Sequence, residues 1–172
     1  MTNVTKDDLK QIIIAYQYWK VLNQQLQRFA SRKVNIPECI SEALVCYQLG
    51  YTWHNKATTK NSGDGSFDGK LVEIKATSNF NKDLTSFSPD TKFDILIFAR
   101  LDLKNDQLYI YDLNLNFTQF QQLKVNQTQT IFEQQQSGRR PRIRIIETMI
   151  IPNNIQPVAI MDLKALTQEL GI

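Results

Sequence analysis

The residues best suited to catalysis or metal binding lie between positions 62 and 77, in the segment SGDGSFDGKLVEIKAT. Its Asp68–Gly69 pair favours a two-residue hairpin turn, because a type I′ turn needs a positive φ at both central positions. Strands that extend from this turn bring Asp64 directly opposite Glu73, with their β-carbons about 4.5–5.5 Å apart. The predicted register pairs Phe67 with Lys70, Ser66 with Leu71 and Gly65 with Val72.

Alternation along the second strand of this hairpin divides its side chains between two faces. Glu73 and Lys75 point to the face that carries Asp64. The core-facing residues are Val72, Ile74 and Ala76. Two acids that face each other repel unless a cation lies between them, so the pattern indicates a divalent ion. Mg²⁺ combines one or two carboxylates with water and phosphate oxygens, and a neighbouring lysine can orient an attacking water.

This arrangement resembles the PD-(D/E)XK nuclease signature, with Asp64 as the first acid and Glu73–Ile74–Lys75 as the E-x-K part. The sequence departs from the signature at Gly63, where the pattern has proline. The resemblance implies that Asp64, Glu73 and the Ile74 carbonyl hold Mg²⁺, for which Mn²⁺ can substitute. It also implies that Lys75 positions the nucleophilic water.

Other acids also bear on this site. Members of the superfamily often carry an acid on a preceding helix that reaches the metal, and Glu42 is the best match here. Glu38 lies one turn earlier, nearer the helix start, where the helix dipole already favours an acid. Asp68 could replace Asp64 as the metal ligand, although its place in the turn already explains it. We therefore expect Glu42 as an additional catalytic residue.

Over residues 35–165 the chain is similar to small type II restriction endonucleases, most of all the family that cuts GC-N-GC or GC-W-GC sites. The similar segments are IPECISEALVCYQLGY, SGDGSFDGKLVEIKAT, KFDILIFARLD and PNNIQPVAIMDL. The resemblance implies Mg²⁺-dependent cleavage of double-stranded DNA at a short GC-rich interrupted palindrome. A palindromic site matches a C₂ homodimer, and a separate methyltransferase is expected to protect the host DNA.

Basic and amide side chains in two segments are the candidates for DNA contact. The segment SGRRPRIRI carries four arginines, and arginine fits guanine O6 and N7 with two hydrogen bonds. The polar stretch after the active strand leaves the metal site directly. For any one arginine, phosphate contact without base reading is the simpler interpretation. The candidates are Asn79, Asn81, Lys82, Arg139, Arg140, Arg142 and Arg144, of which Arg140, Arg142 and Arg144 are expected to share one face of a strand.

Helices are predicted mainly in the first third of the chain. Apolar residues recur at three- and four-residue steps over positions 9–29, with Thr5 as the N-cap, which predicts a long N-terminal helix. A second helix begins at Pro37 and stops at Gly50, and Asp162 caps a last one. The long first helix is also the candidate dimerisation element.

Strands dominate the middle of the chain. One or two short helices are expected after Asn116. The layout indicates an α/β (α+β) fold with a restriction-endonuclease-like core, in which helices flank a central mixed sheet. The 172 residues fit a single nuclease domain, with residues 1–34 as the N-terminal helix and 35–172 as the core. The predicted strands are Tyr51–Asn55, Ser66–Phe67, Leu71–Thr77, Phe93–Leu101, Gln107–Leu113, Ile143–Ile151 and Val158–Met161.

Composition excludes several other classes of protein. His54 is the only histidine, which rules out metal sites with two histidines, and the phosphate-binding glycine patterns of nucleotide enzymes are absent. No apolar run approaches the ~20 residues that span a bilayer, so no membrane partner is expected. Two cysteines seven positions apart argue against a disulfide scaffold and favour a cytoplasmic location. A net charge of +3 permits a polyanionic partner without requiring one.

Two alternative functions remain open at this point. The first is a nuclease of the same superfamily that acts on structured DNA, such as a junction resolvase or a repair nuclease. The second is a DNA-binding domain that keeps the fold without catalysis.

Overall fold

A mixed β-sheet forms the centre of the structure, a computed structural model that describes residues 2–29, 33–55 and 63–172. Within these residues seven strands are joined in the order β1-β2-β3-β4-β6-β7-β9, and β5 pairs separately with β8. Neighbouring strands are antiparallel except β4 and β6, which are parallel. The strands are β1 (Thr2–Asn3), β2 (Thr52–Trp53), β3 (Gly65–Phe67), β4 (Lys70–Thr77), β5 (Thr85–Ser86), β6 (Ile95–Asp102), β7 (Gln107–Asp112), β8 (Arg142–Ile143) and β9 (Ala159–Asp162). The helices are α1 (Lys6–Leu26), α2 (Glu38–Leu49), α3 (Phe117–Gln121), α4 (Ile131–Gln136), the π-helix η1 (Ile146–Ile150) and α5 (Leu163–Glu169).

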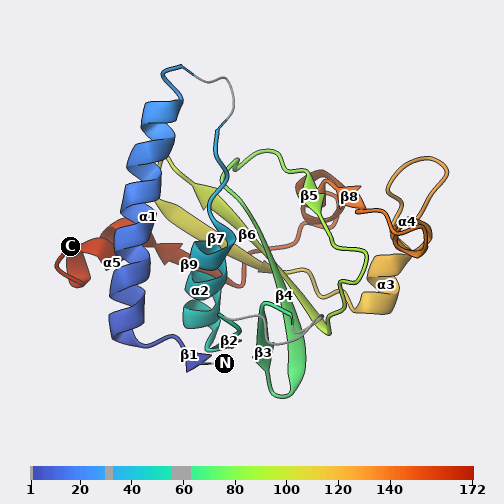
Figure 1. Ribbon diagram of the computed structural model, residues 1–172, viewed down its shortest axis with the longest axis horizontal. Helices are drawn as coiled ribbons and strands as arrows, with labels where there is room; N and C mark the ends of the chain where they lie inside the picture. The colour runs from blue at the N-terminus through green and yellow to red at the C-terminus, as the bar shows by residue number, and fades with distance from the viewer. Residues whose placement is uncertain (1, 30–32, 56–62) are drawn as a thin grey trace.

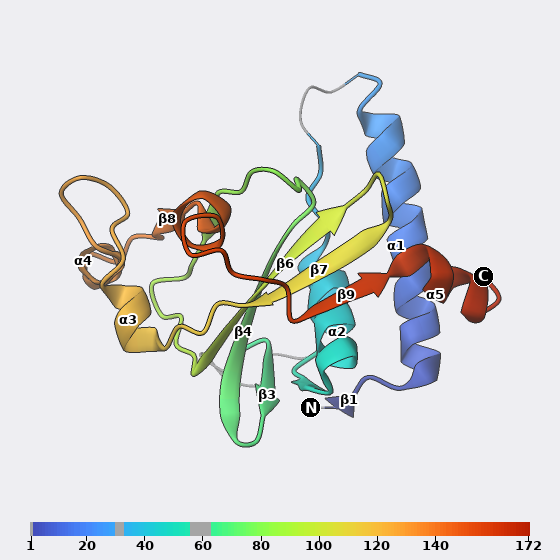
Figure 2. The same cartoon turned by 180° about the vertical axis from the view of Figure 1, so that it is seen from behind.

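Helices flank the sheet on both sides (Figure 1), which confirms the expected α/β architecture. α1, α2 and α5 bury their apolar residues against one face, and α3, α4 and η1 bury theirs against the other. From behind, β6, β7 and β9 lie side by side and β9 leads directly into α5 (Figure 2). The sheet thus separates two clusters of buried side chains.

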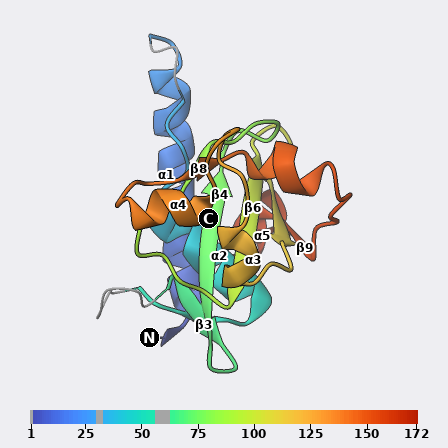
Figure 3. The ribbon, with the colours of Figure 1, turned by 90° about the vertical axis from the view of Figure 1, so that its right-hand side faces the viewer.

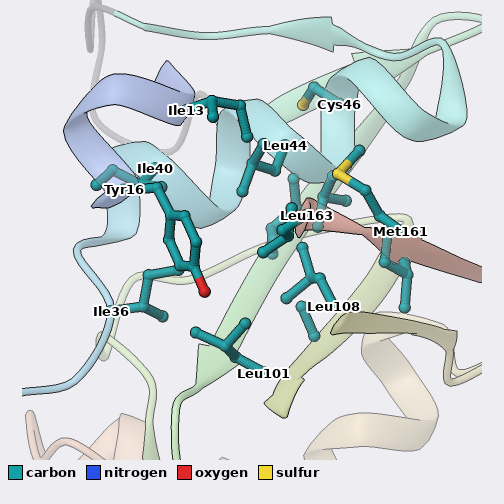
Figure 4. Packing of buried hydrophobic residues seen from close by; sticks show 14 of the residues in the cluster. Ile13, Tyr16, Ile36, Ile40, Leu44, Cys46, Leu101, Leu108, Met161 and Leu163 are labelled. Carbon is teal, nitrogen blue, oxygen red and sulfur yellow. The ribbon is translucent and has the colours of Figure 1, made fainter. Parts of the chain in front are cut away.

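We call these the first and second core clusters. The first is mostly aliphatic and lies between the sheet and α1, α2 and α5; Figure 4 shows part of it, including Ile13, Tyr16, Leu44, Leu108 and Met161. The second is rich in aromatic rings and includes Phe87, Phe93, Phe98, Phe120 and Ile146. β6 contributes buried residues to both clusters, as its nearly continuous apolar run predicts, whereas the buried apolar residues of β4 belong to the first cluster.

The long N-terminal helix is confirmed, together with its predicted cap. Thr5 accepts the Asp8 N–H at 3.1 Å while the Asp8 carboxylate accepts the Thr5 N–H at 2.9 Å, a capping box. The core-facing stripe consists of Leu9, Ile13, Tyr16 and Trp19. The far end of α1 projects beyond the rest of the molecule (Figure 3), and exposed apolar side chains lie on or just after this part: Tyr18, Val21, Leu22 and Phe29. No helix in the described ranges is both long and apolar enough to cross a membrane.

The elements around the predicted site also match expectation. α2 follows Pro37 and ends at Gly50, whose φ of +69° is the left-handed conformation that favours glycine after a helix. β3 and β4 pair in the predicted register, from Phe67 with Lys70 to Gly65 with Val72. The hairpin that carries the candidate chemistry was therefore predicted correctly from its turn residues.

The predicted strand over Ile143–Ile151 is wrong. Only Arg142–Ile143 is a strand, and the chain then enters η1. Asp83 explains the difference, because its carboxylate accepts the N–H groups of Ile145 and Ile146, each at 2.9 Å, and so supports a helix start. Arg140, Arg142 and Arg144 still alternate with buried residues and are exposed, but they do not share a strand of the expected length.

Candidate active site

Backbone hydrogen bonds hold Asp64 one position beyond the last ladder pair of the β3–β4 hairpin. Its N–H donates to the Val72 carbonyl at 2.9 Å, and its carboxylate accepts the Ile74 N–H at 2.8 Å. Gly63 precedes it with a φ of +63°, and a Cβ there would lie 2.9 Å from the Val72 carbonyl oxygen. Proline cannot adopt this positive φ, so the backbone geometry accounts for glycine where the nuclease signature has proline.

Lys75 brings the two opposed acids into one cluster. Its Nζ lies 2.6 Å from Glu73 Oε1 and 3.9 Å from Asp64 Oδ2. The exposed fractions of the side chains are 22% for Asp64, 9% for Glu73 and 19% for Lys75. The ring of Phe87, from the second core cluster, has its centroid 5.8 Å from the same Nζ. The structure therefore brings together the three residues of the predicted signature, in a partly buried place.

Burial sets the electrostatics of this cluster. It raises the pKa of the Asp64 and Glu73 carboxyl groups, although the positive charge of Lys75 opposes the rise. Burial alone would lower the pKa of Lys75, but the charges of Glu73 and Asp64 outweigh it and the pKa is raised. Lys75 therefore stays a cation at neutral pH and serves as a hydrogen-bond donor, while the two carboxylates would gain from a further positive charge.

A cleft of about 940 Å³ has Ile74 and Lys75 among its lining residues. Its walls come from the end of β4 with the loop that follows, the start of α2 with the segment before it, and the beginning of η1. Of the predicted DNA contacts, Asn79, Lys82 and Arg144 line this cleft, whereas Asn81, Arg139, Arg140 and Arg142 do not. Two predicted segments thus contribute to one concave surface beside the carboxylate–lysine cluster.

The sequence interpretation missed several residues of the cleft, among them Lys33, Asn35 and Glu147. The Asn35 side chain accepts the Ser78 N–H at 2.8 Å and donates to the Ala76 carbonyl at 3.0 Å, which ties the segment before α2 to the end of β4. Asn35 and Ser78 are 43 positions apart in the chain, so no local spacing indicates the contact. The charge of Lys33 was the only signal available for that residue.

The two acids of α2 occupy different surroundings. Glu42 accepts a hydrogen bond from Trp53 Nε1 at 3.3 Å, and burial together with the charge of Asp64 raises its pKa to about 7. Glu38 is exposed and lines the cleft, whereas Glu42 is not among the lining residues. No side-chain hydrogen bond caps α2 at Pro37, and the negative charge of Glu38 acts on both Asp64 and Glu73. Glu38 thus lies in the first turn of α2, where the helix dipole favours an acid, and its charge also acts on the site.

Comparison with known proteins identifies the family. The model of the Bsp6I restriction endonuclease family matches residues 4–152. The chain belongs to the Bsp6I restriction endonuclease family. The type II restriction enzyme Bsp6I from Bacillus sp. (strain RFL6) is 39% identical over 161 residues, which cover 94% of this chain and 91% of that protein. No solved structure gives a significant match.

Membership in the Bsp6I family confirms the predicted enzyme class, a type II site-specific deoxyribonuclease, and with it DNA as the substrate. Restriction endonucleases of this type depend on a divalent metal ion. The described residues contain no group of three or more His, Cys, Asp or Glu side chains placed to hold a metal. The two carboxylates of Asp64 and Glu73 nevertheless fit an ion such as Mg²⁺, which takes one or two carboxylates and completes its shell with water and phosphate oxygens.

Proposed function

We propose that this member of the Bsp6I family cuts both strands of DNA at a short GC-rich interrupted palindrome of the GC-N-GC type, with Mg²⁺ as its cofactor. The observation that carries the proposal is the Asp64–Glu73–Lys75 cluster, whose lysine lines a cleft with basic residues on its walls. The GC-N-GC site comes from the family resemblance of the sequence. The whole chain, residues 1–172, is proposed to act as one nuclease domain.

In this proposal Asp64, Glu73 and the Ile74 carbonyl hold the Mg²⁺ ion, and Mn²⁺ can take its place. When bound, the ion supplies positive charge that stabilises the phosphate in the transition state. Lys75 orients the attacking water by hydrogen bonding and offsets negative charge on the phosphate. A lysine is protonated at neutral pH and its ammonium group has no free lone pair, so in this proposal Lys75 positions the water rather than removing its proton.

The helix acid of the site is proposed to be Glu42, acting through a water molecule, with Glu38 as the competing candidate. Their places differ enough for a direct comparison, because Glu38 lines the cleft and Glu42 is hydrogen-bonded to Trp53. Glu42→Gln should slow cleavage more than Glu38→Gln if the proposal is right. The reverse order, measured as kcat on one cognate duplex, would assign the role to Glu38.

DNA is proposed to lie in the cleft, with the amide and basic residues of its walls next to the duplex. These are Asn79, Lys82 and Arg144. Asn81, Arg139, Arg140 and Arg142 are proposed to contact the phosphate backbone from the surface beyond the cleft. Such contacts hold the protein in register on the duplex without reading sequence.

A C₂ homodimer is the proposed active form, because the described part of the chain forms one such cluster and a palindromic site has two scissile bonds. The exposed apolar side chains at the projecting end of α1 support this helix as the dimer contact. Sedimentation with cognate DNA at micromolar concentration tests it, and a monomer would contradict it. A protecting methyltransferase is proposed as a genetic partner that does not bind the enzyme.

The decisive experiment incubates the purified protein with unmethylated plasmid and Mg²⁺, with Glu73→Ala as the control, and sequences the ends of the products. Discrete fragments that share one GC-N-GC-like motif and are absent from the control are the expected result. Cleavage only at branched or damaged DNA would instead indicate a resolvase or repair nuclease. Lys75→Ala should abolish cleavage and retain DNA binding; unchanged cleavage in this variant would refute the assigned chemistry.

A further inference from the structure

Arg144 is the one arginine of the basic segment that lines the cleft with Lys75. We propose that Arg144, oriented by Glu147 and fixed through Asp83, reads a guanine of the recognition site instead of contacting a phosphate. This inference rests on the proposed function and deepens it, because it names the residue that gives the cleft part of its sequence preference. Arg139, Arg140 and Arg142 are exposed but lie outside the cleft lining.

The first support is the fixed backbone on both sides of Arg144. The Asp83 carboxylate accepts the N–H groups of Ile145 and Ile146, each at 2.9 Å, and the Thr85 hydroxyl at 2.7 Å. β5 pairs with β8 immediately beside these contacts. The backbone around Arg144 is therefore fixed both by this strand pairing and by the Asp83 carboxylate. Reading a base edge requires a side chain that is fixed to well under 1 Å, whereas a phosphate contact tolerates a looser mounting.

The second support is the partner of the guanidinium group. Arg144 Nη1 lies 3.2 Å from Glu147 Oε2, and both residues line the cleft. A carboxylate this close would repel a phosphate, so the pair is poorly suited to a backbone contact. A guanine edge is uncharged and offers O6 and N7 to arginine, and a carboxylate can accept the N4 hydrogens of the paired cytosine. The pair therefore matches a G·C base pair better than it matches a phosphate.

The third support is the connection between the backbone around Arg144 and β4, the strand that carries Glu73 and Lys75. Asp83 lies in the loop that leaves β4, and Thr77 at the end of β4 donates its hydroxyl to the Lys82 carbonyl at 3.4 Å. The Phe87 N–H donates to the Pro141 carbonyl at 3.0 Å on the other side of the β5–β8 pair. Arg144 is thus linked to the strand of Glu73 and Lys75 through a short series of hydrogen bonds.

Conservative replacement of Arg144 by lysine tests the inference. Lysine keeps the charge, so a phosphate contact would survive, but it loses the planar two-donor fit to guanine. On a cognate GC-N-GC duplex, kcat/KM of Arg144→Lys should fall by about 5- to 150-fold, as expected for one bidentate base contact. When each G·C pair of the duplex is replaced in turn by A·T, the variant and the wild type should be nearly equal on the duplex that lacks the pair read by Arg144, and the variant should remain slower on the others. Lys164→Arg, an exchange of the same two residue types at an exposed position of α5, should behave as wild type on all of these duplexes.

Glu147→Gln tests whether Glu147 orients Arg144. The measured quantity is the ratio of kcat/KM on cognate and mismatched duplexes, which a general loss of stability does not change. That ratio should fall, with circular dichroism confirming an intact fold. An unchanged cognate-to-mismatch ratio in Arg144→Lys would show that Arg144 contacts phosphate and would overturn the inference. An unchanged ratio in Glu147→Gln would overturn the orienting role of Glu147. Wild-type protein that cuts no GC-rich site would overturn the proposed function itself, and the two failures are therefore distinguishable.

Discussion

Replacing Glu42 by glutamine should stabilise the protein at neutral and alkaline pH, and by an amount that depends on pH. Glu42 is half-buried on α2, where burial and the charge of Asp64 raise its pKa from 4.5 to about 7. The hydrogen bond from Trp53 Nε1 does not offset this rise, and a glutamine carbonyl can accept the same hydrogen. The substitution therefore removes the charge while it keeps the contact.

Proton linkage gives the magnitude. One pKa unit is worth about 1.4 kcal/mol, so a rise from 4.5 to about 7 lowers the free energy of unfolding by at most about 3 kcal/mol when the carboxylate is charged. Below pH 4.5 the group is protonated in both the folded and the unfolded chain, and this loss is absent. As the pH rises from 4.5 to 7 the unfolded chain releases its proton first, so stability is lost across that window. Glutamine does not ionise, so the Glu42→Gln variant does not lose this part of its free energy of unfolding as the pH rises.

Urea unfolding followed by far-UV circular dichroism, with EDTA present, measures the effect. Glu42→Gln should match the wild type near pH 4 and exceed its free energy of unfolding by up to about 3 kcal/mol at pH 8. Glu169→Gln, which removes an exposed carboxylate from α5, should show no such growth with pH. A difference between Glu42→Gln and wild type that is equal at both pH values would refute the reasoning.

Three further outcomes are expected. Mg²⁺ should raise the melting temperature of the wild-type protein without DNA, and calorimetry should find no such rise for Glu73→Gln. Gly65→Ala should lower the free energy of urea unfolding by about 1–3 kcal/mol, because a Cβ would lie 2.9 Å from the Thr52 carbonyl oxygen. Arg100→Ala should reduce kcat/KM on a cognate duplex, because Arg100 Nη2 donates to the Phe80 carbonyl at 2.6 Å and fixes the loop after β4.

Each of these three predictions would be contradicted by a specific result. An equal rise in melting temperature for Glu73→Gln would show that the ion binds elsewhere. If Gly65→Ala had the same free energy of unfolding as the wild type, β2 could move away from β3 at no cost in stability. Wild-type kcat/KM in Arg100→Ala would mean that the loop after β4 is held by its other contacts, and Arg100→Lys serves as the matched variant that retains the charge.

The hairpin of the candidate site could be predicted from the sequence because its determinants are local. Asp68–Gly69 fixes the turn, the turn fixes the register, and the register places Asp64 beside the E-x-K strand within a dozen residues. The helix caps at Thr5, Gly50 and Asp162 were predictable for the same reason, since each is set by residues within one turn.

The regions that could not be predicted depend on contacts between distant parts of the chain. The isoleucines of residues 143–151 have the composition of a strand, and only the carboxylate of Asp83, 62 residues before Ile145, supports a helix start there. The wall of the cleft before α2 depends in the same way on Asn35 and Ser78. The short strands β1 and β5, with two residues each, have no periodicity that a sequence pattern could detect.

The position of the carboxylate–lysine cluster against the second core cluster has a thermodynamic consequence. Lys75 lies next to the ring of Phe87, which belongs to the second core cluster. The three ionisable side chains of the carboxylate–lysine cluster therefore occupy positions beside the core that apolar residues could fill. A leucine or methionine at position 75 would extend the aromatic packing and remove a buried charge, although the two acids would then need neutral replacements as well. Such a triple replacement should raise the free energy of unfolding, and under the function proposed above this rise equals the stability that the enzyme gives up for catalysis.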